Sequence, residues 1–419
     1  MGWEQLHRGI DLPLDPAIIV PTLTEVTLPV IHRAAVADVE SAAREEVIAR
    51  FADAVTSGMT VAVGAGSRGL TGRVELLRGA ITGLRVLGAA PFVVPAMGSH
   101  GGATEQGQLA TLAKLGMTPD ALDAEIRSSM ETIVVAHDAS GRPLHLDVHA
   151  AGADRILPVN RMKPHTAFRG TVESGCTKMI VVGFGKQRGA AQFHSSGALV
   201  MRSQLIEGID AMRGTGRILG GVASVEAAGG DVVAVHALTS DEVGGPAEVA
   251  LTDKARELVA ALPFPDIDVL VIERGGKDIS GTTLDPNVTG RFWVDGLEDL
   301  PSPRVAMIVL LGLTAVTAGN ATGIGFADFI PVSLAEQIDW ESTYVNSFTA
   351  GGSGVRRARM PMVLPDEDSC IRAALQSCGQ PWDAPKKVVR IPSTLHLTRC
   401  WVSEALVDEL PTGATITRS

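Results

Sequence analysis

"MTVAVGAGSRGLTGRVELLRGAITGLRVLGAAPFVVPAM" (residues 59–97) decides the fold class of this chain. Residues 59–66 and 90–97 are short apolar runs typical of buried strands, and residues 71–89 between them have the composition of a helix. Strands that are apolar on both faces and are joined by a helix indicate a parallel sheet covered by helices. The stretch therefore predicts an α/β fold.

The same alternation continues along the chain. We expect a helix at 38–55, a strand at 132–138 and further strands within 143–160 and 177–185. A second alternating set of strands and helices begins near residue 264. Both sets predict mostly parallel sheets.

Chain length and a proline-rich joint near residue 262 indicate two domains. At 419 residues the chain exceeds the usual size of a single core. We expect an N-terminal catalytic and cofactor domain at 1–262 and a C-terminal α/β domain at 263–419. The terminal segment 395–410 could pack back on the first domain.

Composition and charge argue against several classes of partner. The net charge is −11 and no block of Lys or Arg occurs, so neither nucleic acid nor an anionic membrane is an expected partner. The longest apolar run, residues 305–316, is too short to span a bilayer, and the first residues do not resemble a secretory signal. The four cysteines form no CxxC pair. We therefore expect reduced thiols in a cytoplasmic protein.

A glycine-rich loop follows the first strand of the quoted stretch. Gly64, Gly66 and Gly69 satisfy the GxGxxG pattern between a strand and a helix. In dinucleotide-binding folds the next strand ends in an acid, but here it ends in "VVPAMGSH". Backbone amides at the helix start, together with Ser67 and Arg68, can still hold a phosphate. The loop therefore favours a phosphate-bearing ligand over NAD.

A histidine stands at the tip of the second strand, in "AMGSHGGATEQ" (96–106). Ligands of open α/β sheets bind beyond the carboxyl ends of the strands, and glycines beside His100 leave its ring exposed. His100 is either a general base at a binding crevice or a solvated loop residue.

Residues 160–195 gather four groups that can carry chemistry, although the chain has only ten His and four Cys. His165 follows a proline, Lys178 stands at the start of an apolar run, and His194 lies sixteen residues beyond that lysine. Lys178 either extends to solvent or is desolvated and made nucleophilic. Cys176, His165 and His194 could bind a metal, but their spacing matches no closed zinc pattern.

Three motifs together resemble the nickel-pincer lactate racemase family and its larger homologues. They are "GSHGGATEQ" (98–106), "KPHTAFRG…SGCTKM…GFG…H" (163–194) and "GGKDISGTTLDPNVTGR" (275–291). The resemblance spreads over most of the chain. It implies two α/β domains with the active site between them.

The resemblance also implies roles for individual residues. His100 and His165 would be the acid/base pair, and Lys178 would anchor a nickel-pincer nucleotide (pyridinium-3,5-bisthiocarboxylic acid mononucleotide) through a thioamide. His194 would ligate the nickel, and Arg68 would bind the phosphate, beside Gly66, Ser67 and Gly69. The partners would be a small-molecule 2-hydroxy acid and the enzymes of cofactor biosynthesis.

The block at 273–291 carries many hydrogen-bonding groups directly after a predicted strand. Either it is a capped, salt-bridged loop, or it forms the second domain's wall of the site. In the second case Lys277 or Arg291 would bind the substrate carboxylate.

The leading hypothesis is an isomerase, a racemase or epimerase of a 2-hydroxy carboxylic acid that works by hydride transfer. One alternative is a metal-dependent hydrolase or lyase that uses His165, His194 and Cys176 with a divalent ion. Another is a non-catalytic nucleotide-binding protein.

Overall fold

The computed structural model of the protein describes residues 7–29, 34–67, 71–166, 168–228, 230–259, 261–294 and 296–417. The chain divides into two compact units. One unit comprises residues 32–259, and the other combines residues 1–31 with 260–419.

The unit of residues 32–259 is built on a five-stranded sheet in the order β3-β2-β6-β7-β8. Its strands are β2 (Thr60–Ala65), β3 (Ala90–Pro95), β6 (Arg155–Met162), β7 (Gly220–Glu226) and β8 (Val232–Thr239). The first four run parallel, and β8 runs antiparallel to β7. This is the α/β architecture with a mostly parallel sheet that the sequence predicts, so the fold class is confirmed.

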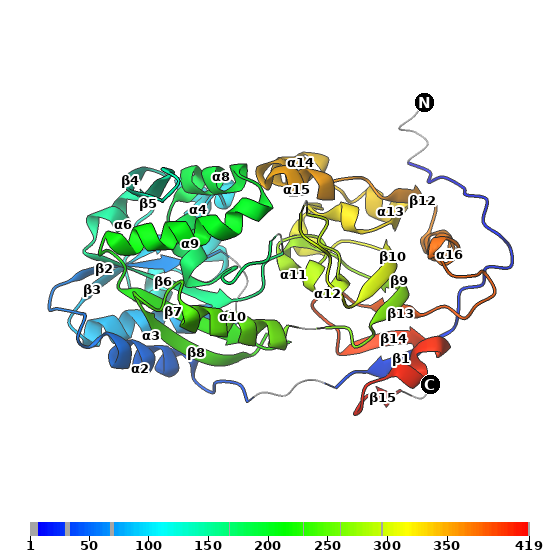
Figure 1. Ribbon diagram of the computed structural model, residues 1–419, viewed down its shortest axis with the longest axis horizontal. Helices are drawn as coiled ribbons and strands as arrows, with labels where there is room; N and C mark the ends of the chain where they lie inside the picture. Colours follow the sequence, from blue (N-terminus) through cyan, green and yellow to red (C-terminus); the bar gives the residue numbers. More distant parts are fainter. Residues whose placement is uncertain are drawn as a thin grey trace. The chain divides into compact units, whose positions relative to one another are not determined.

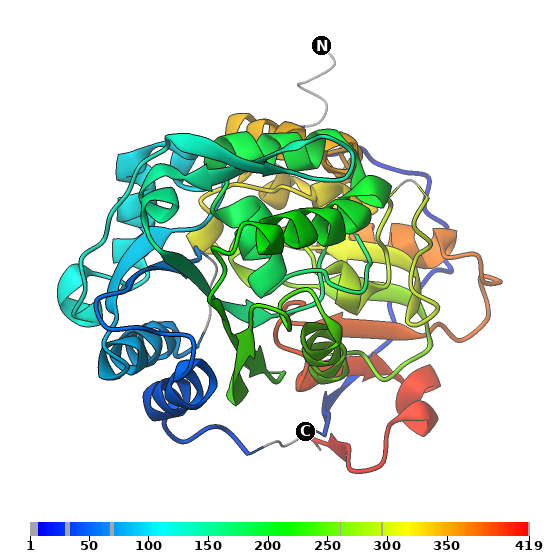
Figure 2. The same ribbon diagram turned by 60° about the vertical axis from the view of Figure 1, so that its left-hand side comes forward.

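Helices cover both faces of this sheet. Figures 1 and 2 show α2 (Val39–Phe51) and α3 (Arg73–Val86), in blue, side by side on one face. Their apolar residues share one core with Val61, Val63 and other strand residues. The opposite face packs on α9 (Ala198–Gly214) and α10 (Pro246–Leu258), around a second core. The predicted strands at 59–66 and 90–97 and the helix between them are confirmed.

Shorter elements complete this unit. A two-stranded antiparallel hairpin joins β4 to β5. The bounds are η1 (Gly101–Ala103), α4 (Glu105–Lys114), α5 (Pro119–Leu122), β4 (Thr132–His137), β5 (Pro143–Asp147), α6 (Val148–Gly152), α7 (Cys176–Lys178), η2 (Met179–Gly183) and α8 (Lys186–Ser195).

The prediction of a strand at 177–185 is wrong. These residues form the end of α7 and the π-helical turn η2, which continue toward α8. Met179, Ile180, Val181 and Val182 are all buried. A short segment that is buried on every side shows a continuous apolar run whether it is a strand or a helix, so periodicity could not distinguish the two.

The second unit contains an eight-stranded mixed sheet in the order β12-β11-β10-β9-β13-β14-β1-β15. The strands β12, β11, β10, β9 and β13 are parallel, and β14, β1 and β15 add to one edge in antiparallel pairs. The bounds are β1 (Leu23–Thr27), β9 (Asp266–Ile272), β10 (Arg304–Leu310), β11 (Phe329–Pro331), β12 (Met362–Leu364), β13 (Val388–Ile391), β14 (Arg399–Ser403) and β15 (Thr415–Ile416).

Helix α16 packs on one face of this sheet, and loops with short helices cover the other. The helices are α11 (Lys277–Ser280), α12 (Pro286–Thr289), η3 (Ala315–Thr317), η4 (Ile324–Phe326), α13 (Val332–Ala335), α14 (Trp340–Thr349), α15 (Gly351–Arg357), α16 (Glu367–Ser377) and η5 (Glu404–Glu409).

The N-terminal strand differs from the expected domain division. Val26 of β1 lies opposite Cys400 of β14, so residues 23–27 belong to the unit of residues 260–419 rather than to an N-terminal domain 1–262. The terminal segment 395–410 supplies β14 to that same sheet. The pairing joins strands at opposite ends of the chain, and a local sequence pattern cannot predict which distant strand will be the partner.

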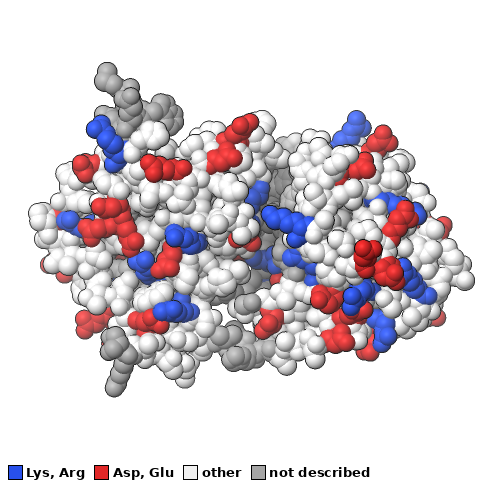
Figure 3. Space-filling view, turned by 180° about the vertical axis from the view of Figure 1, so that it is seen from behind, with Lys and Arg blue, Asp and Glu red and all other residues white. Residues whose placement is uncertain are grey.

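Acidic and basic side chains lie intermixed over the face of the molecule shown in Figure 3. Among the described residues, none of the helices combines the length and the apolar character needed to cross a membrane.

Candidate active site

His100 lies beyond the carboxyl end of β3, opposite the loop that follows β2. Its ring is exposed, and its Nδ1 lies 2.5 Å from the hydroxyl oxygen of Ser67. The contact joins the two adjacent βα loops at the edge where open α/β sheets bind ligands. Because Ser67 engages Nδ1, it orients the ring and influences which nitrogen carries the proton.

A fully buried glutamine holds the backbone beneath His100. The Nε2 of Gln108, in α4, donates to the carbonyl oxygens of Gly98 at 2.9 Å and of His100 at 3.3 Å. Gly98 has a φ of 61°, a conformation that glycine adopts without strain. The glutamine therefore fixes a sharp turn directly before the histidine.

Lys186 supports this glutamine from the interior. Its fully buried Nζ donates to the Oε1 of Gln108 at 3.0 Å and to the carbonyl oxygen of Pro95, and it lies 3.2 Å from the Oδ2 of Asp147. Burial lowers the pKa of Lys186, and the nearby Asp147 opposes that effect. The Lys186–Asp147 ion pair thus holds Gln108 in place, and Gln108 in turn fixes the backbone of the His100 loop.

The side chains of His165 and Lys178 are in contact elsewhere in the unit of residues 32–259. The Nζ of Lys178, the last residue of α7, hydrogen-bonds to the Nε2 of His165 in the loop after β6. Both also contact Phe168, whose ring centroid lies 4.3 Å from that of His165 and 5.9 Å from the Lys178 Nζ. Phe168 is buried, so it forms a fixed apolar surface for the pair.

A buried carboxylate shapes the loop that carries His165. Glu173 accepts hydrogen bonds from the backbone N of His165 at 2.8 Å and of Gly170 at 3.1 Å. It also accepts from Arg169 at 3.2 Å and from Arg256 at 2.7 Å. Glu173 is fully buried, and these charged and backbone donors compensate its desolvation.

A second buried acid holds the start of α7. Glu248, in α10, accepts from the backbone N of Thr177 at 3.0 Å, from its hydroxyl at 2.6 Å and from Gly244 N at 2.7 Å. Burial raises the pKa of Glu248, and its hydrogen bonds act in the opposite direction. Because Thr177 precedes Lys178, Glu248 helps to position that lysine.

His194 lies in the last turn of α8 and is half-buried. Its ring packs edge-to-face on Phe193 at 5.5 Å, and Phe193 packs on Phe168 at 6.5 Å. Aromatic contacts therefore connect His194 to the ring on which His165 and Lys178 meet.

Cys176 takes no part in this arrangement. It is fully buried, and its Sγ lies 3.8 Å from the carbonyl oxygen of Val222 on β7. Burial raises the pKa of the thiol well above its usual value, which disfavours the thiolate that a metal requires. No group of three or more His, Cys, Asp or Glu within the described ranges could hold a metal ion. As placed, Cys176 is a poor candidate for the metal ligand that the alternative hydrolase or lyase would need.

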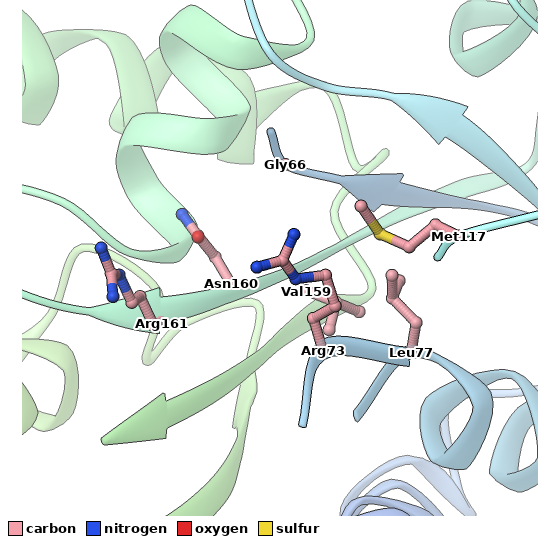
Figure 4. A pocket seen from close by; sticks show the side chains of 7 residues that line it. All are labelled: Gly66, Arg73, Leu77, Met117, Val159, Asn160 and Arg161. Atoms are coloured by element: carbon pink, nitrogen blue, oxygen red, sulfur yellow. The ribbon is translucent and has the colours of Figure 1, made fainter. Parts of the chain in front are cut away.

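The glycine loop lies only partly within the described residues. Gly66 and Ser67 are described, whereas Arg68 and Gly69 lie outside them. Gly66 lines a small cavity of about 20 Å³, room for about one water, which Figure 4 shows together with its neighbours. The other lining residues are Arg73, Leu77, Met117, Val159, Asn160 and Arg161.

Sequence reasoning missed the two arginines at this cavity. Arg161 forms a 2.7 Å ion pair with Glu226, which also accepts from the backbone N of Thr71 at 3.0 Å. Burial and the proximity of Arg161 lower the pKa of Arg73. Arg73, Arg161 and Glu226 together carry one net positive charge near Gly66.

Lys277 and Arg291 lie in the other unit. Arg291 is buried, pairs with Asp328 at 2.7 Å and donates to the carbonyl oxygens of Val305 and Ala306. Protein acceptors thus surround its guanidinium. Lys277 is half-buried and hydrogen-bonds to Asn346. Arg291 is thus enclosed by protein acceptors, whereas Lys277 remains partly accessible.

Comparison with known proteins finds a likeness of fold. No protein-family model matches the sequence, and no curated protein matches it significantly. The fold resembles that of lactate racemase. The solved structure is the lactate racemase apoprotein from Thermoanaerobacterium thermosaccharolyticum, with a TM-score of 0.54 and 13% identity over 90% of this chain and 99% of that one. At this identity the likeness shows a shared fold.

Proposed function

We propose that this protein is an isomerase, a racemase or epimerase of a 2-hydroxy carboxylic acid. The observation that carries the proposal is the contact between the Lys178 Nζ and the His165 Nε2 on the ring of Phe168. The fold shared with a lactate racemase over 90% of the chain supports the same reaction class.

The residues fit a lysine-tethered nickel-pincer nucleotide. Lys178 offers an amine on a short, well-anchored helix, and His194 offers one imidazole close to the same aromatic cluster. Such a metal would take its remaining ligands from the organic group, which suits the lack of a three-residue ligand cluster within the described ranges. Ser67 and the net positive charge near Gly66 suit its phosphate. When bound, the group would supply an acceptor and donor for the substrate's α-hydrogen as hydride.

The two histidines would handle the hydroxyl proton of the substrate. His165 presents its Nε2 to the lysine, and His100 is held by Ser67 through Nδ1. Inversion of a carbon centre needs one acid/base group for each face of the planar intermediate, and imidazole can both accept and return a proton near neutral pH. The two rings come from different loops at the same end of the sheet, which would allow each to serve one face of the substrate.

The test is an activity assay on protein produced together with the cofactor-building enzymes. A panel of enantiopure 2-hydroxy acids, each with deuterium on the α-carbon, is incubated with the protein and resolved by chiral chromatography. The proposal predicts inversion of at least one acid with retention of its deuterium. Inversion with complete exchange of deuterium into solvent would reject hydride return, and inactivity of protein shown to be loaded would reject this substrate class.

The matched variants are His165→Gln and His137→Gln. His165→Gln should lower kcat by at least about 100-fold, the usual contribution of a general acid/base group. His137, in the β4–β5 hairpin, has no role in the proposal, and its substitution should leave kcat unchanged.

A further inference from the structure

An open cavity of about 350 Å³ lies in the unit of residues 1–31 and 260–419. It is lined by Trp293, Val294, Arg356 and Arg359. Cavities of this volume are common binding sites for small organic molecules.

Trp293 is held in an unusual conformation at the wall of this cavity. Its φ is 47°, in the left-handed region that bulky side chains rarely adopt. The carboxylate of Asp299 accepts from the backbone N of Phe292 and of Trp293, and Arg357 donates to the carbonyl oxygen of Phe292. Strained residues that their surroundings hold in this way are concentrated at ligand sites.

The Trp293 ring is fixed but remains accessible. Its centroid lies 6.0 Å from that of Phe326 and 5.5 Å from the Arg291 guanidinium, yet 38% of the residue is exposed. An aromatic side chain that is anchored on one side and open on the other is suited to stack a flat group at low entropic cost.

The remaining polar wall of the cavity is cationic. Arg356 lies in the last turn of α15, and Arg359 follows two residues after the end of the helix. Both side chains are exposed. Arg357 between them is buried and packs on Phe326, so it anchors this arginine-rich segment. Guanidinium groups match the planar geometry of carboxylate and phosphate oxygens.

We infer that this cavity binds an organic oxyanion, a carboxylate or phosphate ester attached to a flat apolar group. The oxygens would bind Arg356 and Arg359, and the flat group would stack on Trp293. The inference rests on this cavity alone and goes beyond the proposed isomerase activity.

The experiment uses the full-length protein labelled with 5-fluorotryptophan. The chain has five tryptophans, and the Trp293→Phe variant identifies the ¹⁹F resonance of Trp293. Benzoate and phenyl phosphate are the two anionic probes, and benzamide is the neutral control of similar shape. The inference predicts a saturable shift of the Trp293 resonance with at least one anion. Tighter binding of benzoate would identify the oxyanion as a carboxylate, and tighter binding of phenyl phosphate would identify it as a phosphate ester. An unchanged resonance with both anions at about 10 mM, where weak ligands still bind, would overturn it.

Variants distinguish specific binding from a general salt effect. Arg359→Gln should weaken the preferred anion by about 10-fold or more, and Arg359→Lys should weaken it less because the charge remains. Trp293→Gly should abolish binding of the preferred anion measured by isothermal titration calorimetry, and it should melt no lower than Trp293→Ala, because glycine tolerates the left-handed backbone. An equal shift with benzamide, or unchanged affinity in Arg359→Gln and Arg356→Gln, would also overturn the inference.

Discussion

The Nζ of Lys178 hydrogen-bonds to the Nε2 of His165, a residue thirteen positions earlier in the chain. A protonated amine can only donate, so a protonated Lys178 requires Nε2 as the acceptor. Modification of the lysine would therefore change the environment of the histidine directly. The buried acids Glu173 and Glu248 fix the two segments that make this contact.

Phe168→Leu tests the aromatic surface beneath the pair. The substitution keeps an apolar side chain but removes the ring contacts to His165 and Phe193. We expect a loss of about 1–3 kcal/mol in the free energy of unfolding together with a lower kcat. Phe51→Leu is the control, because Phe51 is equally buried in the core of α2 and α3. It should lose comparable stability at unchanged kcat, and an equal effect on kcat from both variants would contradict the positioning role.

Glu173→Ala tests the organisation of the His165 loop. Removing the acid leaves the nearby Arg169 and Arg256 without its charge and frees the backbone N of His165. We expect a destabilisation of about 3–5 kcal/mol, measured by urea denaturation, because one partner of a buried ionic network is lost. The control is Asp253→Asn, which removes an exposed partner of the same Arg256 and should cost at most about 1 kcal/mol.

Lys186→Met tests whether the buried Lys186–Asp147 ion pair stabilises the His100 loop. The variant leaves Asp147 buried and unpaired and removes the support of Gln108. We expect a loss of about 3–5 kcal/mol and faster backbone hydrogen exchange around Gly98. Adding Asp147→Asn should restore part of the stability, because Asn can still cap α6. If the double variant is as unstable as the sum of the two single variants, the ion pair does not exist in solution.

Stability should fall as the solution becomes acidic below about pH 6.5. Burial lowers the pKa of His236 below the usual value of about 6.5, and burial also lowers that of His145. Below about pH 6.5 the unfolded chain therefore binds more protons than the folded protein, so the free energy of unfolding decreases as the pH falls toward the folded pKa. Denaturation at pH 7.5 and 5.5 should show a smaller pH-dependent loss in His236→Gln than in the parent. His396→Gln, at an exposed site, should behave like the parent.

The local elements of the parallel sheet were predictable from the sequence because each has its own pattern. Residues 60–65, 73–86 and 90–95 combine apolar runs with a strand or helix signature. The pairing of β1 with β14 was not predictable, because it depends on a partner more than 370 residues away. The all-apolar segment 179–183 fits a buried strand or a buried helix equally well.

For the candidate site, the sequence identified the groups that carry chemistry but not those that hold them. His165 and Lys178 stand out by residue type, and the structure brings them into contact. Phe168, Glu173 and Gln108 act through packing and backbone hydrogen bonds, which leave no motif. Glu173 is the only acidic residue between Asp154 and Glu207, and this is the one signal that could have been noticed.

Peptide-mapped mass spectrometry of protein produced with the cofactor-building enzymes tests the central claim most directly. The account predicts a nucleotide-sized, nickel-containing adduct on the peptide that carries Lys178. Lys178→Ala should lack the adduct, and Lys163→Ala should retain it. An unmodified Lys178 in protein that inverts a 2-hydroxy acid, or an adduct at another lysine, would contradict it.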